Sequence, residues 1–60
     1  MKVTVKIQAE ADAWYVVTTA RLGPFRDRAT AFRMASDIAE ALRAQGDEVD
    51  LIDENGDPAG

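Results

Sequence analysis

Asp27–Gly46 reads DRATAFRMASDIAEALRAQG, and its apolar residues recur with the period of an α-helix. Asp27 fits the N-cap position, because its carboxylate can accept hydrogen bonds from the free amides of the first turn. Gly46 fits the position just beyond the last turn, where a left-handed backbone favours glycine. The sequence therefore predicts a helix over about residues 28–45. Its apolar side carries Ala31, Phe32, Ala35, Ile38, Ala39 and Leu42, with Met34 and Ala41 at the margins.

Three short segments have the patterns of β-strands. Lys2–Gln8 alternates between polar and apolar residues, which is typical of a strand with one buried face. Trp14–Ala20 is rich in aromatic and β-branched residues, but its pattern leaves open which face is buried. Beyond the helix, Glu48–Asp53 alternates again and directs Ile52 outward.

The remaining segments are interpreted as loops. Ala9–Ala13 contains two acids and no bulky residue, which favours a hairpin loop. Arg21–Arg26 contains Gly23-Pro24, a strong turn signal, and should lead from the second strand into the helix. Asn55-Gly56 predicts another turn, and residues 57–60 are expected to be loose.

The elements follow the order ββαβ and predict an α+β fold in a single domain, residues 1–60. We expect a three-stranded, mainly antiparallel sheet with the helix packed on one face. The first strand should lie in the middle, antiparallel to both neighbours. The other sheet face and both sheet edges would then stay uncovered and available to partners.

The composition argues against catalysis. The chain has no His and no Cys, which removes the usual general base, the commonest metal ligand and any thiolate. We therefore expect a protein that is not an enzyme and needs no cofactor or metal. Asp53, Asn55 and Asp57 are spaced like the first ligands of a calcium loop. Because Pro58 stands where that loop needs glycine and the closing Glu is missing, we interpret the segment as a solvated turn.

The charges divide the chain into two halves. Residues 1–33 contain six bases and three acids, a net charge of +3, whereas residues 34–60 contain one base and eight acids, a net charge of −7. The densest acidic segment comprises Asp47, Glu48, Asp50, Asp53, Glu54 and Asp57. These carboxylates could keep a small protein soluble and protect an edge strand from aggregation. Alternatively, they could form a negative ridge that docks into a basic groove and imitates a row of phosphates.

A second candidate site is basic. Arg21, Arg26 and Arg28 surround the loop that leads into the helix, where arginines and helix amides could together hold a phosphate. With the open sheet face, they would form a small nucleic-acid-binding surface, and Trp14 and Tyr15 could stack on bases if exposed. The alternative is that these charges are solvated and balance the acidic half.

Apolar, alanine and glycine positions form a further pattern over about Trp14–Gly56. It consists of Trp14, Phe25, Ala31, Ala35, Ala39, Gly46, Val49–Ile52 and Asn55-Gly56. In this pattern the chain resembles an uncharacterised family of small ββαβ domains, found mostly in bacteria and their phages. The resemblance implies the fold but no site residue, because the family has no established site. By size, composition and lack of catalytic residues, the chain is also similar to small acidic phage proteins, including anti-CRISPR inhibitors.

We therefore predict a non-catalytic binding protein that acts through the acidic segment on a basic groove of a protein or nucleoprotein complex. In its most concrete form it is a nucleic-acid-mimicking inhibitor of a phage-defence (CRISPR-type) or other nucleic-acid-handling complex. The alternative is nucleic-acid binding by the arginines. A homodimer is a further expectation, because a small domain without disulfides often gains stability by self-association. No apolar run reaches the length of a membrane span or signal peptide, so we expect a cytoplasmic protein, in the host cell if phage-encoded.

Overall fold

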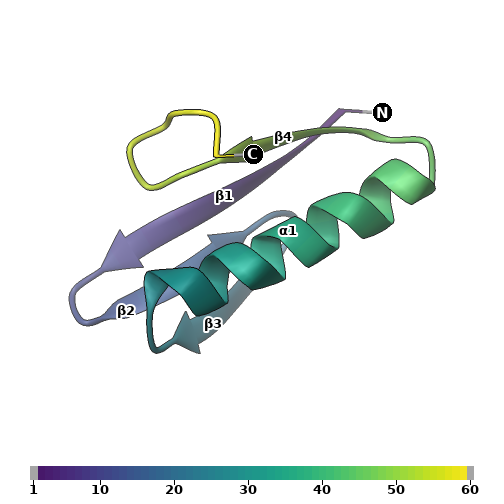
Figure 1. Cartoon of the computed structure of the whole chain (residues 1–60). Helices are drawn as coiled ribbons and strands as arrows, with labels where there is room; N and C mark the ends of the chain where they lie inside the picture. The colour runs from purple at the N-terminus through teal and green to yellow at the C-terminus, as the bar shows by residue number, and fades with distance from the viewer. Residues whose placement is uncertain (1, 60) are drawn as a thin grey trace.

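Four strands and one helix make up residues 2–59, which are the residues that this computed structural model describes (Figure 1). In chain order they are β1 (Lys2–Glu10), β2 (Ala13–Val17), β3 (Arg21–Phe25), α1 (Arg28–Ala44) and β4 (Glu48–Ile52). The strands form one mixed sheet in the order β3-β2-β1-β4, and α1 lies across one of its faces. The α+β class and the central position of the first strand are thus confirmed.

The predicted order ββαβ is wrong, because Arg21–Phe25 forms a strand rather than a loop. β3 is an edge strand, where the missing N–H of Pro24 need not cost a ladder hydrogen bond. Its pairing with β2 shifts register between Trp14 and Val16, so Gly23-Pro24 marks a bulge within the strand. The preceding residues Thr18–Ala20, predicted to end the second strand, form the β2–β3 turn instead.

The missed strand also reverses the direction of the last one. β2 and β3 are antiparallel, so the chain enters α1 in the opposite sense from that expected without β3. β4 consequently runs parallel to β1, with Val5 opposite Leu51, and not antiparallel as predicted. The crossover through α1 connects the two edge strands β3 and β4.

The predicted helix ends are confirmed. The Asp27 carboxylate accepts a hydrogen bond from the Thr30 amide at 2.8 Å, and this bond is the main reason that the pKa of Asp27 lies below its usual value. Gly46 has φ +96° and donates to the Arg43 carbonyl at 2.9 Å, and the Asp47 amide donates to the Leu42 carbonyl at 3.1 Å. These two bonds form a Schellman motif, which satisfies carbonyls that the helix itself leaves open.

The core lies between α1 and the sheet. Ala31, Ala35 and Ala39 are fully buried, and these small side chains allow the helix to approach the strands closely. The sheet contributes the buried residues Val5, Ile7, Val16 and Leu51, and Trp14, Leu22, Phe25 and Val49 pack around them. Trp14 and Val16 therefore belong to the inner face of β2, which the sequence pattern had left open. Tyr15 and Val17 belong to the other face, which carries no helix (Figure 1).

The segment after β4 is ordered around its edge rather than loose. Ile52 forms an antiparallel bridge with Pro58, the Asp53 amide donates to the Asp57 carbonyl at 2.9 Å, and the Ala59 amide donates to the Leu51 carbonyl at 2.9 Å. Residues 57–59 thus contradict the prediction, while Gly60 lies outside the described residues. Ile52, predicted to be exposed, is half-buried. Within residues 2–59 no helix is sufficiently long and apolar to cross a bilayer.

Candidate functional site

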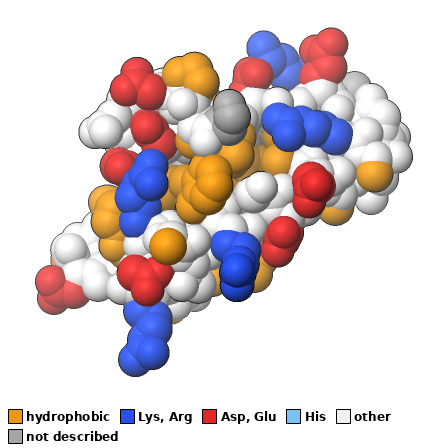
Figure 2. All heavy atoms as spheres, viewed as in Figure 1, with side chains coloured by type: hydrophobic (Ala, Val, Ile, Leu, Met, Phe, Trp, Pro, Cys, Tyr) orange, Lys and Arg blue, Asp and Glu red, His pale blue; other side chains and the backbone are white. Residues whose placement is uncertain are grey.

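The six acids of the predicted partner site lie along one border of the sheet. Asp47 lies between α1 and β4, Glu48 and Asp50 on β4, and the other three in the loop of residues 53–59. Figure 2 shows acidic side chains around this loop, with basic side chains between them. We call this set the acidic border; it comprises Asp47, Glu48, Asp50, Asp53, Glu54 and Asp57.

At least half of the acidic border is engaged within the domain. Asp50 forms a salt bridge with Lys2 at 3.2 Å, and Glu54 accepts from the Arg28 guanidinium at 2.9 Å. The Asp53 carboxylate accepts the amides of Asn55 and Asp57 at 2.9 and 3.0 Å. Asp53 therefore shapes its own turn, because its Oδ1 accepts both of these backbone amides.

Two members of the border remain available to partners. Glu48 and Asp57 are both exposed. Among residues 2–59, neither carboxylate takes part in a salt bridge or a side-chain hydrogen bond. Glu48 stands two residues before Asp50 on the same face of β4, which spaces their Cα atoms by about 6.6 Å. Within the acidic border, the carboxylates without such partners therefore lie at the start of β4 and in the following loop.

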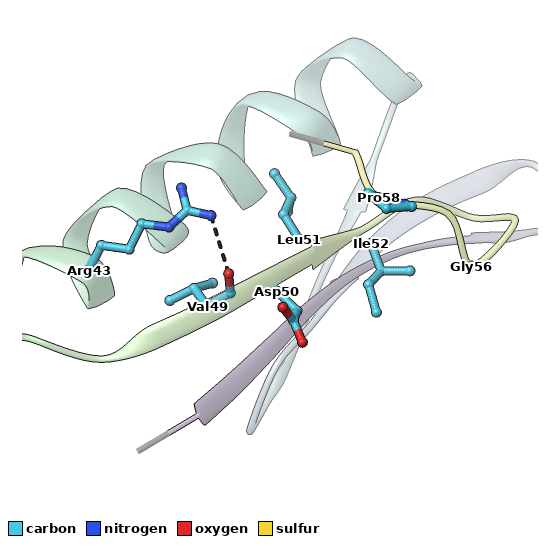
Figure 3. Close-up of a pocket in the computed structure, with 7 residues that line it drawn as sticks. All are labelled: Arg43, Val49, Asp50, Leu51, Ile52, Gly56 and Pro58. Atoms are coloured by element: carbon cyan, nitrogen blue, oxygen red, sulfur yellow. Dashed lines mark hydrogen bonds between the residues drawn. The ribbon is translucent and has the colours of Figure 1, made fainter.

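A groove of about 420 Å³ runs along the outer edge of β4 (Figure 3). Val49 and Leu51 point from β4 toward α1, whereas Asp50 and Ile52 point away from it. Arg43 reaches from the last turn of α1, and its Nη2 donates to the Val49 carbonyl at 3.3 Å. The groove is lined by Arg43, Val49, Asp50, Leu51, Ile52, Gly56 and Pro58.

The predicted basic site is not one cluster. Arg21 begins β3, whereas Arg26 and Arg28 follow its far end. The Arg21 guanidinium lies 4.1 Å from the centre of the Tyr15 ring and forms a salt bridge with Glu10. Arg28 pairs with Glu54, so two of the three arginines are held by different carboxylates.

The two aromatic candidates for base stacking are also separated. Trp14 packs against the core on the inner face of the sheet, and Tyr15 belongs to the opposite face. The Arg21 guanidinium covers the Tyr15 ring. The structure therefore does not bring these residues together into one stacking platform.

Sequence reasoning missed Arg43 as a residue of the β4 edge. Arg43 is not on the apolar side that the sequence predicts for the helix, and the last strand was predicted to run in the opposite direction. The short connection of residues 45–47 was a usable signal, because it requires the last turn of α1 to lie near the first residues of β4. Lys2 was missed for the same reason, since it neighbours the β4 acids only when β1 and β4 run parallel.

Comparison with known proteins assigns no family to this arrangement: no family model, curated protein or solved structure matches the chain significantly. The resemblance to the small ββαβ domain family stays a prediction. The fold and the site define the class of the protein. It is a 60-residue α+β domain that has the acidic border and a groove along one edge of its sheet.

Proposed function

We propose that this domain is a non-catalytic binding protein that docks on a basic protein surface through the acidic border. The observation that carries the proposal is the position of Glu48 and Asp57, two exposed carboxylates beside a groove at one sheet edge. Opposite charges at such a border steer a partner into contact and favour one orientation over others.

The border is suited to this role because its backbone is fixed. The Asp53 carboxylate holds the turn of residues 53–57, and the Ile52–Pro58 bridge ties that turn to β4. Glu48 and Asp57 are therefore presented from a strand and an anchored loop, which lowers the entropy that binding would cost. In its strongest form, the proposal is that these charges replace nucleic-acid phosphates in the basic groove of a nucleic-acid-handling complex.

Direct nucleic-acid binding is less well supported. It needs clustered Lys and Arg that are free to contact phosphates. Here Arg21 and Arg28 are paired with carboxylates, and Arg21 begins β3 whereas Arg28 follows its far end. Arg26 remains exposed, but one arginine in a chain of net charge −4 is a weak phosphate-binding surface.

The test compares two charge-reversal variants of equal net charge. Glu48→Lys with Asp57→Lys alters the border, and Asp37→Lys with Glu40→Lys alters exposed helix positions. Each reversal adds two charges, so both variants change the net charge from −4 to zero. Asp53 and Glu54 are left intact, because both are engaged in hydrogen bonds or ion pairs within the domain.

Binding is measured by fluorescence anisotropy with a labelled ten-residue lysine peptide over a series of salt concentrations. We expect the wild type and the helix variant to bind the peptide with similar affinity, and the border variant to lose at least tenfold. Equal losses in both variants would show that net charge alone attracts the peptide and would reject the border. A labelled DNA duplex is the second probe. If the wild type binds the duplex and the Arg26→Ala variant does not, nucleic-acid recognition is favoured instead.

A further inference from the structure

We propose that the groove beside β4 accepts an extended segment of a partner protein as a fifth strand, antiparallel to β4. The segment would carry Lys or Arg at alternate positions, with apolar residues between them. That the partner is basic follows from the function proposed above. That it pairs as a strand is inferred independently, from the backbone groups of β4.

The chain itself pairs a short antiparallel segment with this edge. Pro58 bridges Ile52, with flanking backbone bonds from Asp53 to Asp57 and from Ala59 to Leu51, each 2.9 Å long. Over the described residues 57–59, this short pairing lies along the C-terminal end of the β4 edge. It shows that a further strand would lie on the side of β4 away from β1 and would run antiparallel to β4.

Among residues 2–59, no strand lies on the outer side of the edge over Glu48–Asp50. The Val49 carbonyl points away from β1, because it accepts a hydrogen bond from Arg43. In a β-strand, the amide and the carbonyl of the same residue point to the same side, so the Val49 amide points away from β1 as well. Val49 therefore directs both backbone groups into the groove (Figure 3). The one bond to its carbonyl is 3.3 Å long and comes from an exposed arginine, so an incoming amide can replace it.

The two sides of the groove determine the side chains that fit. A residue opposite Val49 would share its face and pack toward α1, where Val49 and Leu51 are apolar. Its neighbours would lie on the other face, which carries Asp50 and, by the alternation of side chains along β4, Glu48. The partner is therefore a segment in which basic residues alternate with apolar ones.

A second copy of this chain fits the edge less well. Two antiparallel β4 strands would place Glu48 and Asp50 of both copies on one face, where like charges repel. At the opposite edge, β3 carries the bulge and Pro24, which interrupt regular pairing. The expected homodimer is thus a competing occupant of the β4 edge and a distinct outcome of the test.

The experiment uses three labelled peptides of sequence Lys-Val-Lys-Val-Lys and the full chain. The first peptide is unmodified, and the second is N-methylated on both valine amides. The third is N-methylated on the amides of its middle and C-terminal lysines. Antiparallel pairing directs the amides opposite Val49, those of the apolar residues, toward β4. We expect valine methylation to weaken binding at least tenfold and lysine methylation to change it less than threefold, although all three peptides carry the same charge.

The amide resonance of Val49 should also shift on adding the unmodified peptide and not the valine-methylated one. Equal binding of all three peptides, lost in the Glu48→Lys with Asp57→Lys variant, would overturn the strand pairing and leave the acidic docking intact. Absence of binding by all three would reject both proposals for this edge. If sedimentation shows a dimer of the wild type that the Val49→Lys substitution dissociates, the occupant of the β4 edge is a second copy of the chain. That result would overturn the proposal.

Discussion

Arg28 and Glu54 join the start of α1 to the loop after β4, 26 positions along the chain. The Arg28 Nε lies 2.9 Å from Oε1 and 3.1 Å from Oε2 of Glu54. One residue comes from the predicted basic site and the other from the predicted acidic site. The two sites therefore meet in a single ion pair and neutralise each other where they touch.

Breaking this pair should have a small effect on stability. The side chains are 47% and 22% exposed, so solvent screens their attraction. We expect Glu54→Gln to lower the free energy of unfolding by about 1 kcal/mol or less. Urea denaturation of this variant, of Arg28→Ala and of the double variant gives the coupling energy. A coupling well above that range would mean that the pair holds the C-terminal loop in place.

Gly23 should tolerate alanine much less well than Gly46. Both have positive φ, +134° and +96°, so both substitutions strain the backbone. At Gly23 a Cβ would also lie 2.9 Å from Tyr15 Cδ1 and 3.0 Å from the Trp14 carbonyl, whereas nothing lies within 4 Å at Gly46. Thermal unfolding should show about 1–2 kcal/mol lost in Gly46→Ala, from backbone strain alone, and clearly more in Gly23→Ala. Equal losses would mean that Tyr15 moves aside freely.

The sequence predicted the elements whose signals are local. The period of residues 28–44, the Asp27 cap and the Gly46 stop all lie in the helix or at its ends, and the structure confirms each of them. β3 was missed because Gly23-Pro24 opposes a strand by local propensity, while an edge position and a bulge accommodate both residues. Because strand directions follow from strand count, that one omission also gave β4 the wrong direction.

The candidate site was predictable in location but not in its internal pairing. The density of acids after residue 46 is visible in the sequence, and these residues do lie along one border. Which carboxylates are engaged depends on contacts distant in sequence, such as Lys2 with Asp50. The same holds for Arg43, whose contact with Val49 requires the correct direction of β4.

The close approach of α1 to the sheet gives a packing prediction. Ala35 is fully buried in the core, whereas Ala41 is exposed on the same helix. We expect Ala35→Leu to cost about 1–3 kcal/mol, because the larger side chain overfills the space beneath the helix. Ala41→Leu should change stability by about 0.5 kcal/mol or less. Chemical denaturation measures both, and similar values would indicate that the helix can move away from the sheet at little cost.

The cap at Asp27 predicts how stability depends on pH. The Thr30 amide holds the pKa of the folded-state Asp27 carboxyl below its usual value of 3.8, so folding favours the ionised form. Its contribution should be complete above that usual value and lost as the pH falls through the lower folded-state pKa. Asp27→Asn keeps a side-chain acceptor but cannot titrate. Urea midpoints from pH 7 to pH 2 should therefore converge for Asp27→Asn and the wild type on acidification, and a constant difference between them would contradict this role of the carboxylate.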